Sequence, residues 1–258
     1  LIAQVVSLKM NTEFSAKGYR QMLEYLESCG YTARDFDDAE VGERHVLLRH
    51  DLDMSIDAAL PIAEIEHDME MSATYFVMLR TEFYNPFSKR SLDGLQRLTD
   101  LDHTVGLHLD ISQYGEDWHT VDISADRECA VLEALIERPV DLISFHRPPQ
   151  HVLGLSRPIA GRHHTYEPRY FQEFGYCSDS KGEWQYGNPT NHESVKEGRA
   201  LQLLTHPIWW DANFGENVRE KLDRFALRRF DMFRAELARN CQAYPQEFRA
   251  LDPGTSQI

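Results

Sequence analysis

Apolar and polar residues are arranged along this chain in two recurring patterns. Short apolar runs, typical of buried strands, occur at 45–51, 73–79, 104–109, 141–146, 175–178 and 200–205. Helical spacing of apolar residues predicts helices at 13–30, 56–70, 91–101, 124–137 and 216–240. Strands that alternate with helices predict an α/β fold with a parallel sheet or barrel.

The length of the chain and the order of its elements predict one domain, 1–258. A chain of 258 residues is typical of a single α/β barrel. We expect a barrel core at about 45–210, an N-terminal helical extension at 1–44 and a C-terminal helix at about 216–240. Segment 147–170 is rich in Arg, His and Pro, and a loop of this length is usually functional or mobile.

The formal charge of −15 narrows the range of partners. An acidic surface repels phosphate backbones and anionic lipids, so neither nucleic acid nor a membrane surface is an expected partner. The four cysteines form no CxxC pair, which excludes a zinc ribbon and indicates reduced thiols in a cytoplasmic protein. The start of the chain lacks the features of a signal peptide, although the absence of an initial Met leaves open a leader removed before Leu1.

The most informative segment ends the first apolar run and reads Arg49-His50-Asp51-Leu52-Asp53. Alternate residues of a strand share a face, so Arg49, Asp51 and Asp53 point the same way. Two carboxylates at the end of a buried strand are unfavourable unless a positive charge compensates them. A divalent metal is a common compensation, with one acid as ligand and the other as base. The alternative is a surface turn with solvated acids.

Reactive side chains also end the later strands. These residues are His108 and Asp110, His146 and Arg147, Asp179, and His206. In a parallel barrel, catalytic groups lie at the C-terminal ends of the strands. Each residue alone has a structural explanation, but five strand ends in series predict a catalytic site.

Taken in order, these segments resemble the polysaccharide deacetylases, also called the NodB-homology or carbohydrate esterase family 4 group, over about residues 45–210. The resemblance implies a distorted (β/α) barrel of about seven parallel strands and one divalent metal ion, most often Zn²⁺. It also implies hydrolysis of acetyl groups on sugars. By the first motif of the family, Asp51 is the general base and Asp53 a metal ligand.

The second motif of the family matches with one departure, which leaves the third metal ligand open. His108 matches the first metal-binding histidine of this motif, but Ser112 stands where a second is expected. Zinc in a hydrolase needs three protein ligands and an open position for water. We expect His146 as the third, with Asp110 as the next candidate and His103 less favoured.

The remaining motifs supply the other expected roles. Arg147 matches the arginine that, by the resemblance, orients the catalytic acid, and we expect it to pair with Asp51. Asp179 and Trp184 match the fourth motif, with Asp179 orienting Arg147 or His206 and Trp184 contacting the sugar. His206 matches the general acid that protonates the leaving group.

These features together predict a cytoplasmic, metal-dependent hydrolase that removes an acetyl or other small acyl group from a sugar. The cytoplasmic placement and the acidic surface together favour a small, nucleotide-linked or lipid-linked sugar precursor over a cell-wall polymer. The substitution at Ser112 motivates an alternative, a non-catalytic carbohydrate-binding or scaffold protein on a decayed barrel. The sequence leaves the sugar, the acyl group, the metal and the oligomeric state open.

Overall fold

The computed structural model describes residues 13–115, 117–211 and 215–251. The chain divides into two compact units, Leu1–Asp211 and Ala212–Ile258. The first unit contains the expected core and all of its strand ends, and the second contains the expected C-terminal helix. The grouping of both units into one domain stays a prediction.

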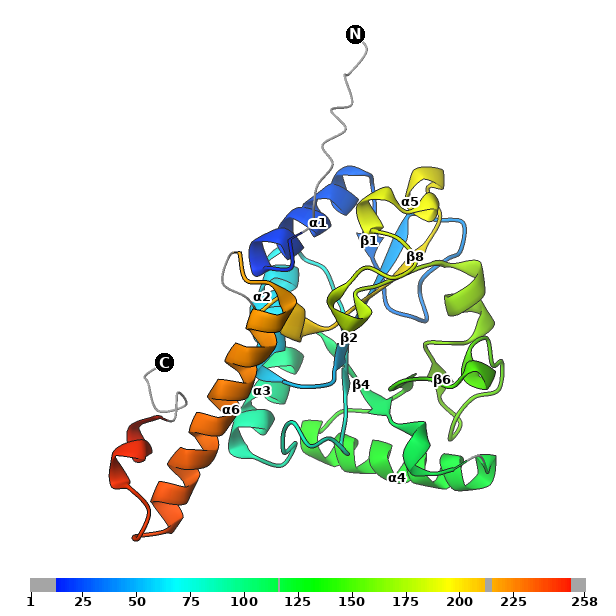
Figure 1. The fold of residues 1–258 in the computed structure, drawn as a ribbon. Helices are drawn as coiled ribbons and strands as arrows, with labels where there is room; N and C mark the ends of the chain where they lie inside the picture. The colour runs from blue at the N-terminus through cyan, green and yellow to red at the C-terminus, as the bar shows by residue number, and fades with distance from the viewer. Residues whose placement is uncertain (1–12, 116, 212–214, 252–258) are drawn as a thin grey trace. The chain divides into compact units, whose positions relative to one another are not determined.

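The first unit is built on a curled parallel sheet (Figure 1). Its strands are β1 Thr32–Ala33, β2 His45–Leu52, β3 Thr74–Val77, β4 Thr104–Leu109, β5 Leu142–Phe145, β6 His163–His164, β7 Gly175–Ser178 and β8 Leu201–Thr205. Their order is β6-β5-β4-β3-β2-β8-β7, with β1 beside β2, and every pair is parallel. No ladder joins β6 to β7 among the described residues. The structure thus confirms a distorted (β/α) barrel of about seven parallel strands.

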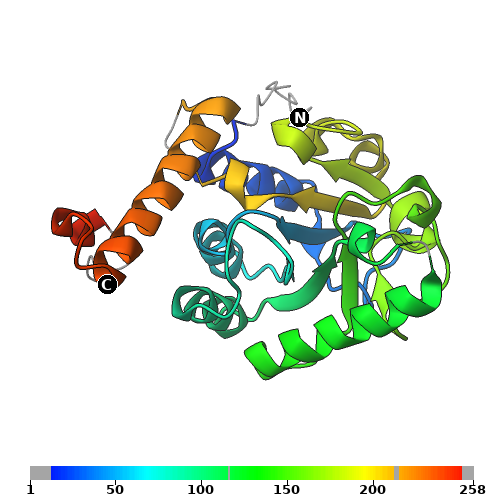
Figure 2. The ribbon, with the colours of Figure 1, turned by 60° about the horizontal axis from the view of Figure 1, so that its bottom comes forward.

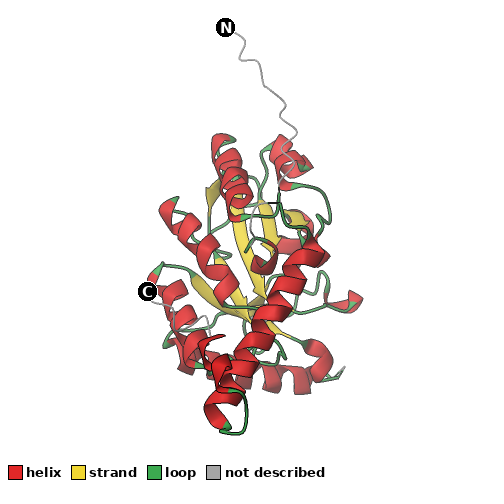
Figure 3. Cartoon of the chain, turned by 60° about the vertical axis from the view of Figure 1, so that its left-hand side comes forward, coloured by secondary structure: helices red, strands yellow, loops and turns green. Residues whose placement is uncertain are grey.

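Helices cover the outside of this sheet, as Figures 2 and 3 show. They are α1 Ala16–Ser28, α2 Leu60–Asp68, α3 Lys89–Asp100, α4 Trp118–Ile136 and the short α5 Glu193–Glu197. Helix α1 packs against α2, α2 against α3, and α3 against α4. Pro61 lies in the first turn of α2, where its missing N–H breaks no helix hydrogen bond.

Segment 147–170 is more ordered than its composition predicts. It contains a 3₁₀ turn, Gln150–Val152, and strand β6, which extends the sheet beyond β5. A π-helical turn, Arg169–Glu173, begins near the end of this segment. Both β1 and β6 have only two residues, too few to produce a recognisable alternation in the sequence.

The interior of the barrel is filled by side chains from neighbouring strands. Asp51 pairs in register with Phe76, and Phe76 with Gly106. A Cβ atom at Gly106 would lie 2.6 Å from Cε1 of Phe76 and 2.8 Å from the carbonyl oxygen of Leu142. Glycine therefore lets the Phe76 ring enter the interior, where the guanidinium of Arg49 lies 5.6 Å from the ring centroid.

In its described residues, the second unit contains helix α6, Val218–Asn240, and a 3₁₀ segment, Gln246–Leu251, that packs on it. A capping box formed by Asn217 and Glu220 begins α6. No helix in the described parts of the chain combines the length and the apolar character needed to cross a membrane. All four cysteines are free thiols.

Candidate active site

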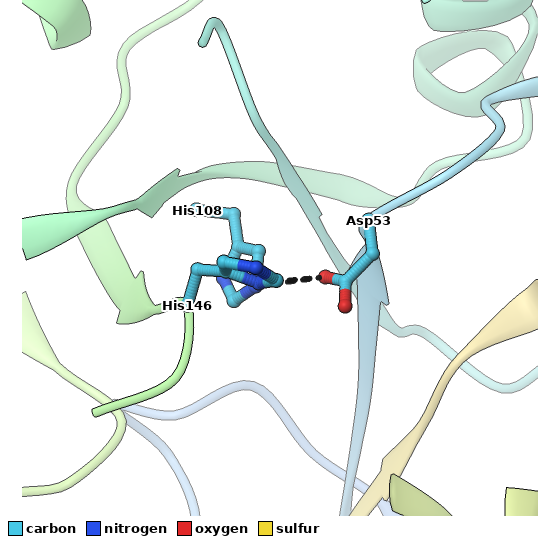
Figure 4. A group of neighbouring side chains, drawn as sticks. All are labelled: Asp53, His108 and His146. Atoms are coloured by element: carbon cyan, nitrogen blue, oxygen red, sulfur yellow. Dashed lines mark ion pairs between the residues drawn. The ribbon is translucent and has the colours of Figure 1, made fainter. Parts of the chain in front are cut away.

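Three side chains from the ends of β2, β4 and β5 converge at the C-terminal edge of the sheet (Figure 4). Asp53 follows β2, His108 lies near the end of β4, and His146 follows β5. Nε2 of His108 lies 3.0 Å from Oδ1 of Asp53, and Nδ1 of His146 lies 3.4 Å from the same oxygen. One ligand atom from each residue lies within 4.8 Å of the others.

This geometry fits a divalent metal ion. Two ligands held at zinc bond lengths in a tetrahedron are about 3.3 Å apart, close to both measured distances. Oδ1 of Asp53 is buried and has no partner with hydrogen-bond geometry among the described residues. Burial alone would raise the pKa of Asp53, but the two imidazoles beside it hold that pKa well below its usual range. An ionised, buried oxygen between two ring nitrogens is suited to a cation.

The two other candidates for the third ligand have different roles. Asp110 caps the turn after β4, where its carboxylate accepts hydrogen bonds from Ser112 and Gln113. His103 precedes β4, and its Nε2 lies 2.9 Å from the carbonyl oxygen of Ala63. Of the three candidates, the structure brings His146 to Asp53, and its role as a metal ligand stays a prediction.

The expected base, Asp51, lies beside this group and is almost fully buried. Nε of Arg49 donates to Oδ1 of Asp51 at 3.0 Å, and Nη2 donates to Oδ2 at 2.8 Å. Burial raises the pKa of Asp51, but Arg49, with His108 and His206, outweighs it and lowers that pKa below its usual value. Asp51 is thus held as a carboxylate.

The partner of Asp51 differs from the one expected. Arg147 is exposed and its backbone has a φ of 48°, and among the described residues no hydrogen bond or ion pair joins it to Asp51. Arg49 takes this place because it lies two residues before Asp51 on the same face of β2. The catalytic role assigned to Arg147 by resemblance stays a prediction.

A serine links the base to the metal-binding group. Oγ of Ser144, on β5, lies 2.5 Å from Nδ1 of His108 and donates to Oδ1 of Asp51 at 3.3 Å. Ser144 is fully buried and pairs in register with His108. The hydroxyl therefore contacts the base and a candidate ligand at once.

The expected acid, His206, faces Asp53 from the end of β8. Asp179 accepts hydrogen bonds from the backbone N–H of His206 and from Nδ1 at 2.6 Å, and Nε1 of Trp210 donates to it at 2.7 Å. Nε2 of His206 lies 3.9 Å from Oδ2 of Asp53. Burial lowers the pKa of His206, but Asp179, Asp53 and Asp51 outweigh it and raise that pKa to about 9. Of its two expected partners, Asp179 bonds to His206, and its orienting role stays a prediction.

Trp184 belongs to an aromatic group beside Asp179. Its ring lies 5.7 Å from Phe14 and 6.1 Å from Trp210. Its buried Nε1 has no hydrogen-bond partner among the described residues. A role for Trp184 in binding sugar stays a prediction.

The sequence motifs missed Arg49 as the partner of Asp51 and did not single out Ser144. The position of Arg49 two residues before Asp51, on the same strand face, could have indicated their pairing. The single hydroxyl in the apolar strand 142–145 could have indicated Ser144. They also missed a buried network behind the site, where His50 lies 2.7 Å from both Glu66 and Thr205. Glu66 is on α2, outside every matched motif, so no local signal identified it.

Comparisons with known proteins give solved structures only. No family model and no curated protein matches the chain. IcaB from Ammonifex degensii has a TM-score of 0.41 and 17% identity, over 51% of this chain and 66% of that one. The deacetylase PplD from Streptococcus pyogenes, in complex with acetate, has a TM-score of 0.44 and 12% identity, over 74% and 80%. A carbohydrate esterase family 4 pseudoenzyme from Bacillus anthracis has a TM-score of 0.41 and 13% identity, over 75% and 63%.

The chain thus spans just under two thirds of the length of the first and third of these structures. Since the TM-scores lie below 0.5, the likeness says nothing about activity, which depends on the residues of the site. The chain resembles the polysaccharide deacetylases of carbohydrate esterase family 4 in the order of its motifs, and the solved structures similar to it include a deacetylase and a pseudoenzyme of that family.

Proposed function

We propose that this protein is a metal-dependent hydrolase that removes an acetyl or other small acyl group from a sugar or sugar-linked precursor. The observation that carries the proposal is the convergence of Asp53, His108 and His146 beside Asp51 and His206. Three protein ligands leave a position open for water, as hydrolytic metal sites require. A general base and a general acid flank the same point.

Each group of residues in the site has a separate role in the proposed hydrolysis. A divalent metal ion, most often zinc, held by Asp53, His108 and His146 would polarise the acyl carbonyl and acidify a bound water. Asp51, kept ionised by Arg49, takes a proton from the attacking water. His206, fixed by Asp179, donates a proton to the leaving amine or hydroxyl of the sugar.

The alternative function is non-catalytic binding of a carbohydrate. The residue that favours it is Ser112, which replaces an expected ligand. In the structure His146 offers a third ligand atom, so the donor set is complete without a histidine at this position. The site also contains a buried carboxylate paired with an arginine, Asp51 with Arg49, and a histidine paired with an aspartate, His206 with Asp179. Binding a sugar requires neither pair, so both support the enzyme.

The substrate class follows from the surface charge and the free thiols. The net charge of −15 disfavours a polyanionic partner. Four free cysteines are consistent with the cytoplasmic location that we propose. We therefore propose a small acylated sugar, or one linked to a nucleotide or a lipid, rather than a cell-wall polymer.

Metal analysis of purified protein tests this function first. We expect about one zinc per chain in the wild type, and loss of bound zinc in Asp53→Ala and His146→Ala, because each removes one of three ligands. Asp110→Ala is the matched control and should retain zinc, since its carboxylate caps a turn.

Activity is then measured with the zinc-loaded protein and a panel of N-acetyl, N-formyl and O-acetyl sugars. We expect release of acetate or formate from at least one, with loss of at least 100-fold in Asp51→Asn, because the base then cannot accept a proton. A zinc-loaded wild type that releases no acid but binds sugar would support the alternative function.

A further inference from the structure

We propose that Ser144 is a positioning residue that selects the metal-binding tautomer of His108 and ties that ligand to the base Asp51. This inference rests on the proposed function, because it concerns a ligand of the metal site. Ser144 lies on β5 between the two groups, 2.5 Å from Nδ1 of His108 and 3.3 Å from Oδ1 of Asp51.

The direction of both hydrogen bonds follows from the donors available. The Asp51 carboxylate already accepts two N–H bonds from Arg49, so it is ionised and can only accept. Ser144 has one hydroxyl proton, which it gives to Asp51. The same oxygen must therefore accept from His108, which places a proton on Nδ1.

A neutral imidazole that is protonated at Nδ1 carries its lone pair on Nε2. Nε2 is the atom of His108 that lies 3.0 Å from Asp53, on the side of the candidate metal site. A ligand nitrogen must be free of its proton to bind a metal. Ser144 thus prepares His108 as a ligand before the metal arrives.

The same contact leaves one oxygen of Asp51 for proton transfer. Oδ1 accepts from both Nε of Arg49 and Ser144, whereas Oδ2 accepts only from Nη2 of Arg49 among the described residues. Oδ2 also lies 3.7 Å from Nε2 of His108, toward the metal side. The hydroxyl therefore orients the base as well as the ligand.

The barrel offers a matched control for the loss of a buried hydroxyl. Thr205, on β8, is fully buried, and its Oγ1 lies 2.7 Å from Nδ1 of His50. His50 points to the opposite face of β2 from Asp51 and is outside the metal-binding group. Thr205→Val removes the same kind of bond from a histidine that binds no metal.

The experiment measures zinc affinity by competition with a chelator in the wild type, Ser144→Ala, Ser144→Thr and Thr205→Val, with thermal unfolding of each. We expect Ser144→Ala to weaken zinc binding by about 10- to 100-fold, the usual effect of removing a group that orients a ligand. Ser144→Thr keeps the hydroxyl and should stay within about 3-fold of the wild type, as should Thr205→Val. An unchanged affinity in Ser144→Ala, or an equal loss in Thr205→Val, would overturn the proposal.

A second measurement needs no metal and no variant of Ser144. Long-range ¹H–¹⁵N spectra of the metal-free wild type, recorded where its histidines are neutral, should show His108 protonated at Nδ1 and bare at Nε2. The signal is assigned by its loss in His108→Ala. A proton on Nε2 would overturn the tautomer assignment. A wild type that binds no zinc but shows the Nδ1 proton would refute the proposed function and leave this assignment standing.

Discussion

Arg49 is a fully buried guanidinium whose N–H groups bond to Asp51, Gln202 and Tyr166. Its planar fork matches the two oxygens of a carboxylate, which a lysine could not do. The tyrosine ring also lies 4.7 Å from the guanidinium carbon. A single side chain therefore holds the base ionised and fills the barrel beneath it.

Arg49→Met should lower the free energy of unfolding by about 3–5 kcal/mol, because it leaves a buried carboxylate without its partner. Urea unfolding measures this change. Arg147→Met is the control: its side chain is exposed, and we expect a change within about 0.5 kcal/mol. Comparable losses in the two variants would contradict the pairing seen here.

At the residue scale, the sequence predicted the positions of the site residues better than the contacts between them. The convergence of Asp51, Asp53, His108, His146 and His206 was predictable because each lies at the end of a strand. The partner of Asp51 was not predicted, because the resemblance pointed to Arg147. That residue follows β5 and has a positive φ. The contacts of Ser144 and Glu66 were not predicted either, because they are made with residues far away in the sequence.

Among the elements, β4 depends on a residue without a side chain. Gly106→Ala would place a methyl group against Phe76 and the Leu142 carbonyl, both closer than 3 Å. We expect a loss of about 1–3 kcal/mol in unfolding free energy, measured by urea denaturation. The double variant Gly106→Ala, Phe76→Leu should recover part of this loss, and no recovery would mean that the ring is not the obstacle.

Helix α4 is tied to the loops after β3 and β4 by Glu128. Its carboxylate accepts from Arg80 at 3.0 Å and from the Tyr114 hydroxyl. Burial raises the pKa of Glu128 from 4.5 to about 7, and Arg80 only partly offsets this. The folded protein therefore holds a proton that the unfolded chain releases between these two values.

A raised carboxyl pKa makes a contribution to stability that is present below about pH 4.5 and is lost as the pH rises through about 7. We expect Glu128→Gln, which cannot ionise, to gain stability relative to the wild type between pH 5 and pH 8. Urea midpoints at several pH values measure this difference. A difference that stays constant with pH would contradict the assignment.

At the element scale, the long strands and helices were predictable and the short ones were not. The bounds of β4 match the sequence prediction because an apolar run with one glycine is distinctive. The two-residue strands β1 and β6 are too short to show a period in the sequence, and each pairs with a longer strand, β1 with the start of β2 and β6 with β5.

For the whole molecule, the candidate site lies entirely within the first unit. We expect a chain that ends at Asp211 to fold and to bind zinc with an affinity within about 3-fold of the full chain, since it keeps every ligand. Circular dichroism and metal analysis of the shortened protein test this. Loss of zinc or of cooperative unfolding would show that the second unit supports the barrel.

The fold class was predictable from the alternation of strands and helices. The division at Asp211 was not, because no stretch rich in Gly, Pro or Ser marks it.

The open sheet ends on two short strands, β6 with two residues and β7 with four. At β7, Ser178 already pairs with Gln185 in an antiparallel bridge. The outermost strands of a sheet expose backbone groups on which strands of other molecules can add. Because β6 and β7 expose so few unpaired backbone N–H and C=O groups, the open barrel does not present a template on which other chains could aggregate.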